Sequence, residues 1–114
     1  MAKSRYLSTD RNLTDLEEIP NVGPSIAGDL RRLGIKKPKA LIGCDPYELY
    51  DELCRITGQT HDPCLLDVFI SAVRYMEGAL PKPWWKYTAE RKREMAARKA
   101  VAPLHGGIPK LPAQ

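Results

Sequence analysis

Apolar side chains recur at the spacing of one helix face along the middle of the chain, and this periodicity predicts short helices. One apolar stripe precedes Gly34, and glycine commonly ends a helix in the left-handed conformation. Its members are Ile26, Ala27, Leu30 and Leu33. Because proline suits the first helical position, this stripe predicts a helix from Pro24 to Leu33.

Two Asp-Pro pairs predict the starts of two longer helices. In Asp45-Pro46 and in Asp62-Pro63, the carboxylate can cap the first turn and the proline suits the first helical position. The segment after the first pair carries an apolar stripe opposite an acidic face, and Thr57-Gly58 closes it. The segment after the second pair is apolar almost all round, which predicts a central helix surrounded by others.

Shorter elements complete the pattern. Thr14 and Glu17 have the spacing of a capping box, so a short helix is expected from Thr14 to about Ile19. A brief helix is also expected over residues 38–42. No stretch from residue 13 to residue 78 alternates apolar and polar residues as a strand does. The predicted fold class is therefore all-α, a compact bundle of about five short helices.

Composition divides the chain into three parts. Residues 1–12 are expected to form a flexible segment, and residues 13–87 form the predicted helical domain. Residues 88–114 indicate a basic, solvated helix followed by a flexible tail, because proline and glycine dominate the last dozen residues.

The net charge of +4 is unevenly distributed. Residues 13–80 hold seven basic and eleven acidic side chains, a net −4, whereas residues 81–114 hold eight basic and two acidic ones, a net +6. A wholly basic binding face on the helical domain is therefore excluded. One local basic cluster follows the first predicted hairpin, and its position favours contact with phosphate. It consists of Arg31, Arg32, Lys36, Lys37 and Lys39.

The residues around the first hairpin resemble the helix-hairpin-helix motif of many DNA repair and processing proteins. The resemblance covers residues 13–35 and lies in Leu16, Ile19, the loop at residues 20–24, Ala27, Leu30 and Gly34-Ile35. A tight turn feeding a helix start presents unpaired amides and a partial positive charge, which suits a backbone phosphate. The resemblance implies a nucleic-acid-binding surface formed by Asn21, Val22, Gly23, Pro24, Ser25 and Ile26 together with the basic cluster.

Within that surface, the resemblance implies separate roles. The amides of Gly23, Ser25 and Ile26 would face the phosphate, and Val22 would be a buried hydrophobic peg. Related hairpins often hold K⁺ or Na⁺ on backbone carbonyls, which here would belong to Glu17, Ile19 and Val22. No other cofactor is expected.

The hairpin departs from the usual motif at two positions. Asn21 replaces the usual first loop glycine, and asparagine tolerates the positive φ of such a turn. Ser25 replaces a lysine or arginine just inside the second helix, so direct phosphate attraction would come only from the more distant basic cluster.

Other side chains suggest alternative chemistry. Cys44, Cys54, His61 and Cys64 have the residue types of a zinc or redox site, but their spacing lacks the Cys-x-x-Cys pattern and favours buried thiols instead. No nucleophile has an identifiable base, so no enzyme activity is predicted, and spare carboxylates are interpreted as helix-surface residues.

The aromatic pair Trp84-Trp85, with Tyr87, lies between Lys82 and Lys86. Such a segment could stack unpaired bases, but the favoured interpretation is that the tryptophans cap the helical core.

Over a longer span the chain resembles the bacterial pathogenicity-locus proteins, some of which are labelled mitomycin-resistance proteins. The resemblance covers roughly residues 13–87. It lies in the Asp-Pro-x-Glu-Leu-Tyr run at residues 45–50, Thr57-Gly58, Asp62-Pro63-Cys64 and Trp84-Trp85. It implies a bacterial origin and the fold, but no activity, because the family is functionally uncharacterised.

The sequence has no apolar run of membrane-spanning length and begins without an apolar signal core, so a cytoplasmic protein is expected. The predicted function is non-catalytic, sequence-nonspecific binding of nucleic-acid backbone, DNA more than RNA. The alternative is a module that binds another bacterial protein, in which the hairpin only packs helices. The oligomeric state stays open.

Overall fold

A computed structural model describes residues 13–105, with side chains to Lys99, and these residues form helices and turns without a strand. The elements are η1 (Leu16–Glu18), α2 (Pro24–Arg32), η2 (Pro38–Leu41), α3 (Pro46–Thr57), α4 (Pro63–Met76), η3 (Trp84–Tyr87) and α5 (Thr88–His105), where η marks a 3-10 helix. The predicted all-α class is confirmed. The flexible segments expected at residues 1–12 and beyond residue 105 lie outside the described residues.

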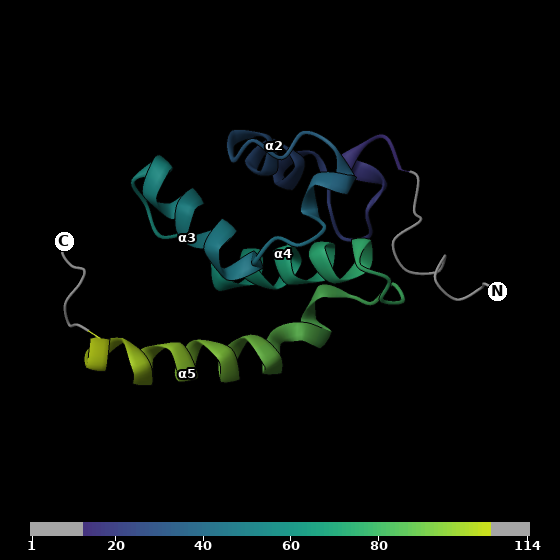
Figure 1. The fold of residues 1–114 in the computed structure, drawn as a ribbon. Helices are drawn as coiled ribbons and strands as arrows, with labels where there is room; N and C mark the ends of the chain where they lie inside the picture. Colours follow the sequence, from purple (N-terminus) through teal and green to yellow (C-terminus); the bar gives the residue numbers. More distant parts are fainter. Residues whose placement is uncertain (1–12, 106–114) are drawn as a thin grey trace.

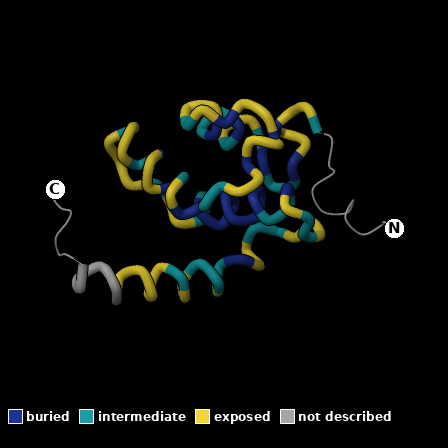
Figure 2. The backbone as a smooth tube through the Cα atoms, in the orientation of Figure 1, coloured by how far each residue is buried: buried dark blue, intermediate teal, exposed yellow. Residues whose placement is uncertain are grey.

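Helix α4 is the centre of the fold. It lies between α2 and α3 on one side and α5 on the other (Figure 1). Nine of its fourteen residues are buried, and Figure 2 shows most of its backbone in the dark blue of buried residues. The prediction of a central helix from an all-round apolar pattern is therefore confirmed.

Both Asp-Pro pairs start helices as predicted. The Asp45 carboxylate accepts a hydrogen bond from the Tyr47 N–H at 2.8 Å, and the Asp62 carboxylate accepts one from the Cys64 N–H at 2.9 Å. Gly58 ends α3 with φ of +71°, in the left-handed region that favours glycine.

The first element differs from the prediction. It is a single 3-10 turn, and its cap is Asp15 with Glu18, one residue later than the predicted pair of Thr14 and Glu17. The Asp15 carboxylate accepts from the Glu17 N–H, while the Glu18 carboxylate accepts from the Asp15 N–H at 3.0 Å. Both residue pairs have capping spacing, and the later register allows Leu16 and Ile19 to be buried.

The interpretation of the segment after residue 87 as a solvated basic helix is wrong for its first turns. Thr88 Oγ1 donates to the Asp67 carboxylate at 2.7 Å, and Arg91 Nε donates to it at 2.8 Å. Asp67 is fully buried on α4, so it is not the helix-surface carboxylate that its type suggested. The beginning of α5 is therefore fixed to the core.

Candidate nucleic-acid interface

The loop between η1 and α2 is held in place by apolar side chains. Ile19 and Val22 are both buried, and the Val22 N–H donates to the Ile19 carbonyl at 3.1 Å. Val22 thus has the burial expected of the hairpin peg. These contacts fix the backbone that leads into α2.

Asn21 provides a second anchor for this loop. Its φ of +73° is a positive value of the kind that asparagine tolerates in such a turn, as expected. Its side-chain amide donates to Ser71 Oγ on α4 at 2.9 Å and to the Lys82 carbonyl at 2.7 Å. The amide is therefore engaged inside the protein, and Asn21 acts here by positioning the loop.

The start of α2 has the features of an anion site. Its cap, Gly23, offers no side-chain hydrogen bond, and Pro24 at the first helical position has no N–H. The next amides, of Ser25 and Ile26, belong to the first turn, whose amides lack partners within the helix. Pro24 and Ser25 are exposed, and a Cβ atom added to Gly23 would meet no atom within 4 Å. The first turn of α2 therefore starts at an exposed position and has no side-chain cap.

The basic cluster lies at the other end of α2. Arg31 and Arg32 occupy its last turn, and Lys36, Lys37 and Lys39 lie around the start of η2. All five side chains are exposed, and Arg31 lies 4.0 Å from the exposed Asp15 carboxylate. A nine-residue helix is about 13 Å long, so about that distance separates the cluster from the amides at the start of α2.

The predicted monovalent-cation ligands are three backbone carbonyls that precede α2 along the chain. The carbonyls of Glu17, Ile19 and Val22 come from η1 and the loop, and that of Ile19 already accepts the Val22 N–H. A carbonyl oxygen has two lone pairs, so this hydrogen bond leaves the Ile19 carbonyl one further acceptor position.

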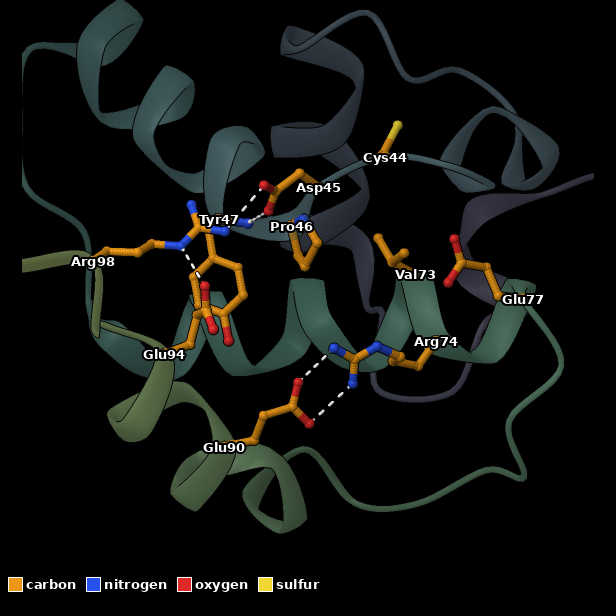
Figure 3. A pocket seen from close by; sticks show the side chains of 10 residues that line it. All are labelled: Cys44, Asp45, Pro46, Tyr47, Val73, Arg74, Glu77, Glu90, Glu94 and Arg98. Atoms are coloured by element: carbon orange, nitrogen blue, oxygen red, sulfur yellow. Dashed lines mark hydrogen bonds and ion pairs between the residues drawn. The ribbon is translucent and has the colours of Figure 1, made fainter. Parts of the chain in front are cut away.

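A separate cavity of about 320 Å³ lies where the start of α3 meets α4 and α5 (Figure 3). Its charged lining is largely paired. Arg74 donates to Glu90 at 2.9 Å, and Arg98 donates to Glu94 at 2.8 Å and to Asp45 at 3.1 Å. The sixth charged group, Glu77, accepts the Gly43 N–H at 3.0 Å. The pairs of Arg74 with Glu90 and of Arg98 with Asp45 connect α3, α4 and α5. The charged groups of the cavity thus hold the three helices together.

Cys44 and Cys64 lack the features of reactive thiolates. Burial, and then Glu77, raise the pKa of the Cys44 thiol, which donates to the Ala40 carbonyl at 3.2 Å. The hydrogen bond with Asp62 is the largest of the effects that raise the pKa of the Cys64 thiol. A low pKa is what activates a thiol, so neither residue has the electrostatics of a nucleophile.

No three histidine, cysteine, aspartate or glutamate side chains gather as a possible metal site within the described part of the chain. His61 instead lies 2.8 Å from Thr57 Oγ1, and its carbonyl accepts the Tyr50 hydroxyl.

Within residues 13–105, no helix combines the length and the hydrophobicity needed to cross a lipid bilayer.

Sequence reasoning missed the group formed by Asp67, Thr88 and Arg91. The signal was a single carboxylate within the apolar run of α4, where Leu66, Val68 and Phe69 surround it. A buried carboxylate requires a partner, so its position called for a basic residue elsewhere in the chain.

Comparison with known proteins places the chain among relatives. A family model described as pathogenicity locus matches residues 9–93, a span that includes the hairpin, α4 and Arg91. The mitomycin resistance protein McrB of Streptomyces lavendulae is 46% identical over 88 residues, which cover 77% of this chain and 84% of that protein. No solved structure gives a significant match. The chain therefore belongs to the pathogenicity locus family, as its motifs indicated.

Proposed function

We propose that this protein binds the sugar-phosphate backbone of nucleic acid, DNA more than RNA, without catalysis and without base specificity. The observation that carries the proposal is the exposed start of α2, where Gly23 provides no side-chain cap for the Ser25 and Ile26 amides. Amides at a helix start attract anions through hydrogen bonds and the helix dipole. They contact phosphate, which is the same for every sequence.

The exposed basic cluster supports the same proposal. Arg32, Lys36, Lys37 and Lys39 form no ion pair among the described residues, so their charges are available to a polyanion. Each lysine that contacts a phosphate should add about one unit to the slope of log affinity against log salt concentration. The cluster would thus set the salt dependence, and the α2 amides would set the position of the strand.

The test is the binding of fluorescent duplex and single-stranded DNA to Gly23→Asp across a salt series. A carboxylate at the cap would occupy the α2 amides and repel phosphate, so affinity should fall about tenfold or more. Asp is a preferred cap, so the variant should stay folded. Gly23→Ala is the matched control. Its Cβ fits the open space, it leaves the amides free, and it should bind as the wild type does.

Two results would contradict the proposal. One is the absence of DNA binding at low salt. The other is equal affinity of the wild type and Gly23→Asp for DNA. Either result would favour the alternative function, a module that docks another bacterial protein, for which the exposed Leu80 and Trp85 provide apolar surface.

A further inference from the structure

An apolar groove lies directly beside the hairpin loop. Its volume is about 400 Å³, and its lining consists of Pro20, Asn21, Pro81, Lys82, Pro83 and Trp85. Trp85 is 58% exposed, although a large aromatic residue beside a core usually folds inward. The groove thus joins the loop before α2 to the segment before α5.

The two adjacent tryptophans have different environments. Trp84 packs against the hydrophobic core, which confirms the core-capping interpretation for that residue. Trp85 remains in the groove, and its ring meets the Trp84 ring at 86° with 5.5 Å between centroids. Trp84 therefore supports Trp85 from the protein side, and the core-capping interpretation is wrong for Trp85.

The groove is preorganised. Asn21 donates to the Lys82 carbonyl at 2.7 Å and to Ser71 Oγ on α4 at 2.9 Å, so its two walls are fixed to each other and to the central helix. Prolines at three lining positions further restrict the backbone. A ligand would meet a surface that needs little rearrangement, which favours binding.

The chemistry of the groove suits an unpaired nucleobase. It offers an aromatic ring and proline rings, Lys82 and Lys86 lie in the same segment, and residues 79–89 contain no acidic side chain. Proteins that bind single strands combine aromatic faces for the bases with basic groups for the phosphates. In a duplex the base faces are already stacked, so this surface favours a single strand or an unpaired end.

The groove and the amides of α2 are close enough to contact one strand. Pro20 in the groove is three residues before Gly23, which an extended chain spans in about 11 Å at most. We infer that a base of single-stranded nucleic acid stacks on Trp85 in this groove while a neighbouring phosphate lies at the start of α2. This inference rests on the proposed function and adds a preference for unpaired nucleotides.

The first measurement is the affinity of Trp85→Ala for fluorescent oligothymidylate and for duplex DNA. Loss of one stacked base should weaken single-strand binding about tenfold and leave duplex binding unchanged. Trp85→Phe should restore part of the loss, because it keeps an aromatic face. Leu80→Ala is the matched control. It removes an apolar side chain that is 76% exposed in the same segment but does not line the groove, so affinity should not change.

A second measurement reports on the ring itself. The wild-type chain has two tryptophans, so Trp85 is the only tryptophan left in Trp84→Phe. Oligothymidylate should quench its fluorescence, whereas an abasic oligomer of equal length and charge should neither quench it nor bind as tightly. If Trp84→Phe does not fold, the affinities of the wild type for the two oligomers provide the same comparison.

The outcomes separate the inference from the function on which it rests. Equal affinity of Trp85→Ala and the wild type for oligothymidylate would overturn the inference. It would also be overturned if the wild type bound the abasic oligomer as tightly as it binds oligothymidylate. In either case a tenfold loss in Gly23→Asp would still support backbone binding. Equal losses of oligothymidylate affinity in Trp85→Ala and Leu80→Ala would also overturn the inference, because the loss would then not depend on the groove.

Discussion

Asp67 is a charged residue that is fully buried in the core. Its partner Arg91 is only 15% exposed. Taking a charge out of water is costly unless the charge is paired and hydrogen-bonded, and here Arg91 and Thr88 both donate to the carboxylate. The pair is thus a strong constraint on where α5 lies.

We predict that Asp67→Ala lowers the free energy of unfolding by about 3–5 kcal/mol, because Arg91 is left largely buried without its partner. That is a large share of the about 5–15 kcal/mol typical of a small domain. Urea denaturation followed by circular dichroism measures it. The double variant Asp67→Leu with Arg91→Met should be more stable than Asp67→Ala, because it removes both charges. A loss below about 1 kcal/mol in Asp67→Ala would show that the pair is not a major constraint.

At single positions, sequence reasoning succeeded where a local rule applied. The positive φ of Asn21 and the burial of Val22 followed from the turn and its apolar residue. The hydrogen bonds from Asn21 to Ser71 and Lys82 were not predictable, because their partners are 50 and 61 residues away. Local patterns contain no information about such pairing.

At the scale of elements, α4 and α5 are joined by a second ion pair. Arg74 donates to Glu90 at 2.9 Å, and this hydrogen bond is the largest of the effects that lower the pKa of Glu90 from its ordinary 4.5. A carboxylate with a lowered pKa in the folded state adds stability above its unfolded pKa and loses it as the pH falls. The contact between α4 and α5 should therefore weaken in acid.

We predict that Glu90→Gln is less stable than the wild type at pH 7 and that the difference shrinks as the pH falls below about 4.5. The reason is that acid protonates Glu90 in the wild type and removes the same charge. Urea midpoints of both proteins from pH 7 to pH 3 provide the measurement. Glu52→Gln, which removes an exposed pair with Arg55 within α3, should show a smaller difference at pH 7. A constant difference for Glu90→Gln across the range would rule out this linkage.

The elements themselves were predicted well where capping and periodicity agreed. The caps of α3 and α4 and the end of α3 at Gly58 have the predicted residues. The first element was predicted one residue too early because two overlapping residue pairs both have capping spacing. Periodicity also cannot separate a single 3-10 turn from a short α-helix, since both bury residues three positions apart.

At the scale of the whole molecule, the first turns of α5 complete the core. Thr88 and Arg91 satisfy Asp67, Glu90 pairs with Arg74, and Arg98 pairs with Asp45 while lying 4.4 Å from the centre of the Tyr47 ring. The sequence suggested a solvated helix here because charged residues and alanine dominate the segment. Its role depends on Asp67, more than twenty residues earlier, and no local pattern connects the two.

This arrangement predicts that a chain truncated after Tyr87 is at least about 3 kcal/mol less stable than one truncated after Lys99. The shorter chain leaves the Asp67 carboxylate buried without Thr88 and Arg91, whereas the longer one keeps every α5 contact described above. Urea midpoints of the two chains measure the difference, and equal midpoints would show that residues 13–87 fold without α5.

Because the short chain should be destabilised, any loss of DNA binding in it would not reveal whether α5 contacts DNA. Lys92→Gln with Arg93→Gln is the better probe, since both side chains are exposed. If α5 contacts phosphate, this variant should reduce the salt slope of DNA binding by about two while the fold is unchanged.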